Sequence, residues 1–292
     1  MKILVTGGSG FIGRNLIEYL ASKHRIVAPV HRDLELLDED AVADFFQSNA
    51  VDIVIHCAVK PGHRNAKDPA SQLYNNLRMF FNIARNSGKF GKMLFINSGL
   101  VYDRRHYRPK MKEEYFDTHV PEDEAGLSKY ISAKYIEKSA NITDLRIFGI
   151  FGKYEDYAIR FISNAICKAI FDLPITLKQN RKFDYLYIDD LMPVIDCFIE
   201  KNPADKAYNV TPDQSIELLA LAKMVKKISG KELPIVVGDK TMGVEYSGDN
   251  SRLKSEMAGL RFTPLETALG KLYKWYLENK SLINKDFLLV DK

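Results

Sequence analysis

Three glycines near the start of the chain, Gly7, Gly10 and Gly13, have the spacing of a phosphate-binding turn. They follow a short apolar run, residues 2–6, and precede a segment, residues 15–20, with apolar residues on one helical face. Gly7 permits a tight turn, Gly10 lets a pyrophosphate approach the backbone, and Gly13 lets the helix pack closely on the strand. The helix N-terminus then faces the phosphate charge. A strand, a glycine turn and a helix in this order predict a dinucleotide site.

The end of the second apolar run, His31-Arg32-Asp33, bears on the choice of cofactor. An acidic residue at this point of such a fold holds the ribose hydroxyls of NAD. An arginine instead binds the 2′-phosphate of NADP through its planar guanidinium. Asp33 lies one or two positions late for the acidic role, so Arg32 favours NADP over NAD. A solvated turn is the alternative interpretation of these three residues.

Apolar runs alternate with helical patterns through the first 150 residues or so, which predicts a doubly wound parallel α/β sheet of the Rossmann type. The expected strands are 2–6, 25–30, 51–58, 92–97 and 143–148, and the expected helices are 15–20, 40–48, 73–87 and 123–140. The second half is less regular, with helices expected at 158–171, 191–200, 215–229 and 264–279 and strands at 184–188 and 207–210.

Two regions follow from this pattern. We expect a nucleotide-binding Rossmann domain at 1–152, completed by about 183–202. A smaller α/β substrate-binding region then comprises 153–182 and 203–292. The ligand cleft is expected between the two, at the carboxyl ends of the strands.

Composition places the chain among ordinary globular proteins. Its 292 residues are 46% hydrophobic and 27% charged, and acidic and basic residues are mixed along it to a net charge of +4, which argues against a nucleic-acid partner. Cys57, Cys167 and Cys197 lie far apart in apolar segments, so we expect reduced core thiols and no metal site. Neither a signal peptide nor a bilayer-spanning run is evident, so a cytoplasmic location without membrane contact is expected.

Residues 95–102, Phe-Ile-Asn-Ser-Gly-Leu-Val-Tyr, together with the opening glycines, resemble the extended short-chain dehydrogenase/reductase family, whose members remodel nucleotide-linked sugars. The resemblance covers nearly the whole chain. It implies that Ser98 hydrogen-bonds the substrate oxygen. It also implies a tyrosine and a lysine, spaced Y-x-x-x-K on one helix face, of which the lysine holds the cofactor ribose and lowers the tyrosine pKa for proton transfer.

Two registers of that motif are possible. Tyr130 and Lys134 fit Y-x-x-x-K literally, whereas residues 125–129, Ala-Gly-Leu-Ser-Lys, fit the family form Y-G-x-S-K everywhere except at the tyrosine. Lys129 precedes Arg146 of the next strand by 17 residues, as in the family, and Lys134 precedes it by only 12. Twelve residues at about 1.5 Å each leave too little helix to cross the sheet and turn into the strand. We therefore expect Lys129 to be the family lysine.

Ala125 then occupies the position of the catalytic tyrosine and cannot donate a proton. Since the surrounding residues still fit the active pattern, an inactive Tyr-to-Ala variant is the favoured explanation. Loss of the chemistry, or use of Tyr130 instead, are the alternatives.

The resemblance extends to further positions. Residues 57–59 fall where the family's third cofactor-facing strand ends, and Asn76 matches an asparagine that braces that end. The arginine that meets the nucleotide diphosphate falls on Phe183, so Arg181 or Lys182 would have to replace it. The residues so assigned to the cofactor are Gly7, Ser9, Gly10, Phe11, Ile12, Gly13, Arg32, Leu36, Leu37, Cys57, Ala58, Val59, Lys60, Asn76, Asn97, Lys129, Phe148 and Ile150. Those assigned to the substrate are Lys60, Gly99, Leu100, Gly149, Tyr157, Arg160 and Lys182.

The reaction is narrowed by what the sequence lacks. Sugar 4,6-dehydratases carry Asp-Glu where this chain has Gly99 and Leu100. Residues 32–46 and 58–62 look most like the GDP-L-fucose synthases, but the epimerising cysteine falls on Leu100 and the histidine near Tyr157. The resemblance therefore suggests NADPH-dependent reduction of a 4-keto sugar nucleotide without epimerisation, close in chemistry to dTDP-4-dehydrorhamnose reductase. A nucleotide-sugar 4-epimerase with bound NAD and a non-catalytic NAD(P)-binding protein are the alternatives. A homodimer built on helices 73–87 and 123–140 is expected by analogy.

Overall fold

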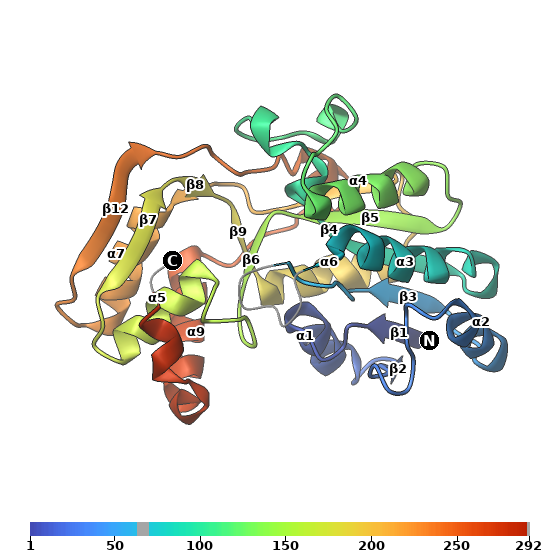
Figure 1. Ribbon diagram of the computed structural model, residues 1–292, viewed down its shortest axis with the longest axis horizontal. Coiled ribbons are helices and arrows are strands. Elements are labelled where there is room, and N and C mark those ends of the chain that lie inside the picture. The colour runs from blue at the N-terminus through green and yellow to red at the C-terminus, as the bar shows by residue number, and fades with distance from the viewer. Residues whose placement is uncertain (63–69, 291–292) are drawn as a thin grey trace.

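Six parallel strands form the central sheet, in the spatial order β2-β1-β3-β4-β5-β10 (Figure 1). The computed structural model describes residues 1–62 and 70–290. The strands are β1 (Lys2–Thr6), β2 (Arg25–Val27), β3 (Ile53–His56), β4 (Lys92–Ser98), β5 (Ile142–Ile147) and β10 (Ala207–Val210). Each neighbouring pair is parallel, which confirms the predicted doubly wound sheet.

Helices cover both faces of this sheet, since successive strand residues point to opposite sides. Val5 of β1 belongs to a buried cluster with Leu16 and Leu191, which lie on the helices of one face. Leu4, the preceding residue, belongs to a second cluster with Phe80 on the other face. The helices of the first face are α1 (Phe11–Leu20) and α6 (Ile188–Glu200), and those of the second are α2 (Glu39–Ser48), α3 (Gln72–Ala84) and α4 (Glu124–Ile136).

A second, smaller lobe lies beside the carboxyl ends of the strands, on the left in Figure 1. It consists of three two-stranded pairs and several helices. The pairs are β6 (Gly149–Phe151) with β9 (Tyr185–Tyr187), β7 (Ile175–Asn180) with β12 (Ile235–Met242), and β8 (Lys182–Phe183) with β11 (Ile216–Glu217). The helices are α5 (Phe161–Ile170), α7 (Leu218–Ser229) and α9 (Leu265–Glu278), while the short α8 (Ser251–Glu256) contacts β10 of the central sheet.

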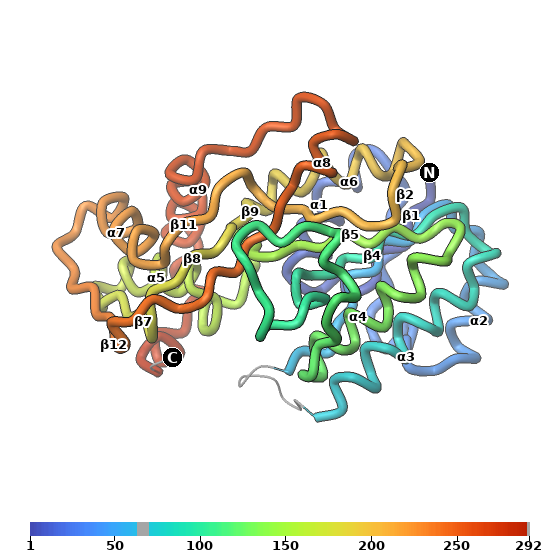
Figure 2. Tube along the Cα trace, turned by 90° about the horizontal axis from the view of Figure 1, so that it is seen from above, coloured from blue at the N-terminus to red at the C-terminus, as the bar shows by residue number. Residues whose placement is uncertain are grey.

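The structure differs from the expected division of the chain at one strand. β10 lies within residues 203–292, which the pattern assigned to the second region, but it pairs with β5 in the central sheet. The chain therefore passes from the sheet to the smaller lobe, back to α6 and β10, and out again (Figure 2). The short strands β6, β7, β8, β11 and β12 were not expected from the sequence, and β11 falls at the start of the helix expected at 215–229.

The three cysteines are all free, with Cys167 buried and Cys57 and Cys197 partly exposed. Trp275, expected in the core, packs edge-to-face against Tyr154 and Tyr276 at the border of the main cluster. Within residues 1–62 and 70–290, no helix has the length and apolar character needed to cross a membrane.

Candidate active site

The glycine turn after β1 closes tightly against the end of β3. Gly7 has a φ of +68°, and a Cβ atom there would lie 2.7 Å from the backbone nitrogen of Ala58. A Cβ on Gly13 would lie 2.3 Å from the carbonyl oxygen of Gly7, so only glycine lets α1 approach the turn. These contacts confirm the tight turn and close helix packing expected from the sequence.

Helix α1 begins with its backbone N–H groups available. Gly10 stands at the N-cap and makes no side-chain cap, and the first turn contains no acidic residue. Phe11, Ile12 and Gly13 line the adjoining cavity. The uncapped helix end and the glycine cradle fit a dinucleotide phosphate, which binds to such N–H groups.

A single large cavity of about 1600 Å³ runs from this turn into the smaller lobe. It exceeds the roughly 300–1,000 Å³ of a pocket for one ligand, so it has room for a cofactor and a second molecule. The predicted cofactor residues that line it are Gly7, Ser9, Gly10, Phe11, Ile12, Gly13, Leu36, Leu37, Cys57, Ala58, Val59, Lys60, Asn97, Lys129, Phe148 and Ile150. The predicted substrate residues that line it are Lys60, Leu100, Gly149 and Arg160.

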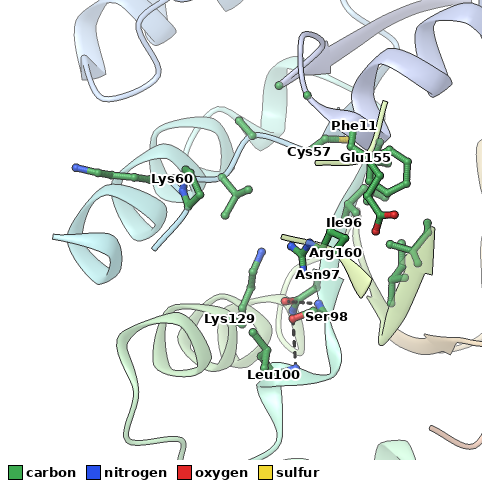
Figure 3. Close-up of a pocket in the computed structure, with 18 of the residues that line it drawn as sticks. Phe11, Cys57, Lys60, Ile96, Asn97, Ser98, Leu100, Lys129, Glu155 and Arg160 are labelled. Carbon is green, nitrogen blue, oxygen red and sulfur yellow. Dashed lines mark hydrogen bonds between the residues drawn. The ribbon is translucent and has the colours of Figure 1, made fainter. Parts of the chain in front are cut away.

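Ser98, at the end of β4, and Lys129, on α4, both line this cavity (Figure 3). The Ser98 hydroxyl accepts a hydrogen bond from the Leu100 N–H at 3.2 Å, and its own proton has no acceptor among residues 1–62 and 70–290, so it can be donated to a ligand. Ser98 is held in turn by Asn97, whose amide donates to the buried Asp144 carboxylate at 2.7 Å. The serine is therefore fixed at the end of β4 by a buried polar network.

Lys129 faces the cavity from α4, with its ammonium 5.0 Å from the centre of the Phe95 ring. Burial lowers the pKa of this lysine to about 8, and the charges of Asp144 and Cys57 act in the opposite direction. Burial also raises the pKa of the nearby Cys57 thiol to about 12. The raised pKa favours the neutral thiol of Cys57, and the lowered pKa favours loss of the Lys129 charge at mildly alkaline pH.

The other candidate pair, Tyr130 and Lys134, lies outside the cavity. The Tyr130 hydroxyl donates to the carboxylate of Asp117, and the Lys134 ammonium lies 2.9 Å from the same carboxylate. A further ion pair joins Lys134 to Glu137 at 2.7 Å. Both side chains are committed to contacts on the surface, so the geometry favours the register with Lys129.

The part of the cavity that lies in the smaller lobe is lined by aromatic residues and by two arginines, Arg160 and Arg181. The rings of Phe183 and Tyr185 line it with their centres 5.5 Å apart and their planes tilted by 35°. Arg181 donates to the Gln179 side chain at 3.1 Å. Of the two cations considered as replacements for the missing diphosphate arginine, only Arg181 lines the cavity.

The comparisons with known proteins identify the family. Residues 3–211 match the sequence model of the NAD dependent epimerase/dehydratase family. The chain belongs to this family. This match confirms the predicted resemblance to the extended short-chain dehydrogenase/reductases.

Relatives that match this epimerase/dehydratase chain over almost their whole length are named for different reactions. It is 23% identical to a GDP-L-colitose synthase of Yersinia pseudotuberculosis, covering 96% of this chain and 99% of that one. It is 25% identical to a UDP-glucose 4-epimerase of Bacillus subtilis, covering 96% and 98%.

Solved structures share the fold at similar distance. The NADP-bound GDP-mannoheptose C4 reductase of Campylobacter jejuni superimposes with a TM-score of 0.81 at 22% identity, over 94% of this chain and 98% of that one. The UDP-glucose 4-epimerase of Thermotoga maritima superimposes with a TM-score of 0.82 at 20% identity, over 97% and 100%.

Several predicted site residues of this family member lie away from the cavity lining. Arg32 has an 89% exposed side chain beside Asp33, although its neighbour His31 lines the cavity. The Asn76 side chain instead accepts from the Lys60 N–H at 2.7 Å, as the bracing role requires. The remaining residues outside the lining are Gly99, which is buried, Tyr157, whose hydroxyl accepts from the Asn284 N–H, Lys182, which is exposed, and Ala125 at the start of α4.

The cavity also has lining residues that the sequence did not suggest. Arg104 and Tyr107 come from the segment between β4 and α4, and Tyr246 comes from the segment after β12. No family motif marks these positions, and they are brought together only by the fold.

Proposed function

We propose that this protein reduces the 4-keto group of a nucleotide sugar with NADPH, in the synthesis of precursors for cell-surface polysaccharides. The observation that carries the proposal is the placement of Ser98 and Lys129 together in one cavity that extends from the glycine turn into the smaller lobe. Relatives named as GDP-sugar synthases and reductases support the substrate class. NADPH, when bound, supplies the hydride that reduces the carbonyl carbon.

Four side chains of the cavity bind the substrate and cofactor and stabilise the charge that develops during reduction. Ser98 donates its free proton to the carbonyl oxygen of the sugar, which fixes and polarises that oxygen. The positive charge of Lys129 holds the cofactor ribose and stabilises negative charge that develops on the oxygen. Arg160 and Arg181 bind the diphosphate through their guanidinium groups.

We infer NADP rather than NAD from Arg32. Its guanidinium is exposed next to the cavity-lining His31 and lies 3.5 Å from the Asp33 carboxylate, a surface contact that it would exchange for a 2′-phosphate. A related reductase is known with NADP bound.

The test is a panel of GDP-, dTDP- and UDP-linked 4-keto-6-deoxyhexoses, incubated with the chain and NADPH while absorbance at 340 nm is followed. Loss of absorbance with one of them, and a 4-hydroxy product by mass spectrometry, would support the proposal. The absence of turnover with every member would contradict it.

A 4-epimerase with bound NAD is the second candidate, because Ser98 and Lys129 would serve it equally and two relatives are named as UDP-glucose 4-epimerases. NAD that stays with the protein through purification, with interconversion of UDP-glucose and UDP-galactose, would favour it. Ala125 keeps a third candidate open, a non-catalytic NAD(P)-binding protein, which would bind NADPH without any turnover.

We further propose a homodimer in which α3 and α4 pack against the same helices of a second copy. The two helices lie side by side, and Tyr74 and Tyr135 on them are 64% and 40% exposed. Light scattering on the purified chain, with Tyr74→Glu as the disrupting variant, measures this directly.

A further inference from the structure

The family's proton donor is missing from this chain, and two other phenols lie in the cavity near Ser98. Ala125 replaces the tyrosine that the family uses, and it does not line the cavity. Tyr107 and Tyr246 do line it. Their positions relative to Ser98 decide whether either hydroxyl can reach the sugar oxygen.

Both hydroxyls lie at Gly99, the residue that follows Ser98. Tyr107 donates its hydroxyl to the Gly99 carbonyl oxygen at 3.2 Å. A Cβ atom on Gly99 would lie 2.8 Å from the Tyr246 hydroxyl, so that hydroxyl occupies the space a side chain would fill. Each phenol therefore reaches the backbone immediately beside the serine.

The two rings form one unit with their surroundings. Their centres lie 5.1 Å apart, and the Tyr246 hydroxyl acts as a hydrogen-bond partner of Tyr107. Tyr246 is clamped further by the rings of Phe148 and Phe183, at 4.9 and 5.8 Å. A rigid aromatic cluster thus holds a pair of phenol oxygens facing the cavity.

Arg104 places a positive charge beside this pair. It lines the cavity three residues before Tyr107, and its guanidinium lies 3.5 Å from Asp123, which caps α4. Its charge lowers the pKa of both phenols, against a larger rise caused by their burial. Asp123 and Asp103 also raise the pKa of Tyr107, so both phenols keep their protons and are able to donate them.

We propose that Tyr107, backed by Tyr246 and Arg104, is the proton donor of this chain in place of the residue at position 125. The inference rests on the proposed reduction. As the carbonyl carbon is reduced, the C=O π electrons move to the oxygen. The Tyr107 hydroxyl turns from the Gly99 carbonyl to the sugar oxygen. Its O–H bond then breaks, a new O–H bond forms on the sugar, and a phenolate remains. The phenolate then takes the proton of Tyr246, which is replaced from solvent in the cavity.

The test compares five variants, one of them Ala125→Tyr alone, with the parent chain in single-turnover oxidation of NADPH by a 4-keto-6-deoxyhexose nucleotide. Tyr107→Phe should lose about 100-fold or more in rate, since a positioned general acid contributes about 10²–10⁴-fold. Tyr246→Phe should lose less, because the donor remains. Tyr115→Phe removes a phenol from the same segment outside the cavity lining and should keep the parent rate. Ala125→Tyr, combined with Tyr107→Phe, should restore part of the lost rate.

A binding measurement separates the donor from a structural role. Calorimetry of the keto sugar nucleotide with NADP⁺, where no reduction can occur, should show about threefold to tenfold weaker binding in Tyr107→Phe, as expected for one lost hydrogen bond. NADPH affinity should stay unchanged.

Two outcomes would overturn the proposal, and they are distinct. If Tyr107→Phe keeps the parent rate, or if the parent is inactive and Ala125→Tyr alone is active, the proton donor is not Tyr107 while the reduction stands. If neither the parent nor Ala125→Tyr oxidises NADPH with any sugar, the proposed function fails and this inference fails with it.

Discussion

The ammonium of Lys129 lies 5.0 Å from the centre of the Phe95 ring, above a buried strand and next to the carboxyl end of the sheet. An aromatic face attracts a cation but compensates only part of the lost hydration. This explains why burial is the main cause of the lowered pKa. The lysine is thus kept at this position at the expense of stability.

Lys129→Met should therefore abolish turnover and raise the free energy of unfolding at pH 7. A pKa lowered from 10.5 to about 8 corresponds to a loss of at most about 3 kcal/mol in the free energy of unfolding. Water in the open cavity makes the actual loss smaller, because it hydrates part of the ammonium. The folded-state pKa lies below the unfolded one, so the destabilisation is full below pH 8 and fades as pH rises toward 10.5. Urea unfolding of parent and variant at pH 7 and pH 10 measures the gain in stability and its decrease with pH. A variant less stable than the parent at pH 7 would contradict the prediction.

The register of the lysine makes a second prediction. Tyr130→Phe removes a hydroxyl that donates to Asp117 on the surface, and it should leave the rate of keto-sugar reduction within about twofold of the parent. The assay is the same NADPH oxidation. A hundredfold loss would instead make Tyr130 and Lys134 the catalytic pair.

Gly7→Ala and Gly230→Ala separate the stability cost of a positive φ from the cost of a Cβ clash. Both costs apply at Gly7 in the nucleotide turn. Both glycines have positive φ, +68° and +65°, but a Cβ on Gly7 meets the Ala58 backbone whereas nothing lies within 4 Å at Gly230. Gly230→Ala should cost about 1–2 kcal/mol from the backbone conformation alone. Gly7→Ala should cost clearly more and abolish NADPH binding. Equal losses in thermal unfolding would show that the approach of β3 to the turn is not tight.

Asp184 should give the unfolding free energy a marked pH dependence. It is fully buried, one carboxylate oxygen accepts from Thr211 and from the Gly248 N–H at 2.7 Å, and the other has no partner among the described residues. Burial raises its pKa to about 7. The raised pKa means that stability is full below about pH 4 and is lost as pH rises to 7, by up to about 4 kcal/mol. Asp184→Asn should remove this slope. The same slope in parent and variant would contradict the assignment.

Arg32→Ser should change cofactor preference without changing stability, because the side chain is 89% exposed. We expect the KM for NADPH to rise about tenfold, as for the loss of a charge-assisted contact worth about 1.5 kcal/mol, while the KM for NADH stays the same. Steady-state kinetics with both cofactors is the measurement. A parallel change in both constants would mean that Arg32 does not select NADP.

The sequence was sufficient for the parts of the fold that depend on local pattern. The apolar run at residues 92–97 was predicted as a strand and forms most of β4. Lys129, chosen from the helix length before Arg146, lines the cavity. The smaller lobe was harder, because β12 has a mostly exposed surface and carries no clear alternation of polar and apolar residues.

The two tyrosines that line the cavity near Ser98 could not be predicted from the sequence for a different reason. Tyr107 and Tyr246 are far apart in the chain, and each lies in an irregular segment. Both reach Gly99 where the segment after β12 meets the segment between β4 and α4, which the bridge between Met111 and Gly248 joins. Tertiary contacts of this kind leave no periodic signal.

The placement of β10 has a consequence for how the protein is made. β5 lacks its outer neighbour until residue 210 has been synthesised, and a chain stopped near residue 152 would present an unpaired apolar strand edge. Such an edge invites aggregation of nascent or truncated chains. The nucleotide-binding half should therefore not be obtainable as a stable fragment ending at 152, and protection by a chaperone is most needed while the smaller lobe is being translated.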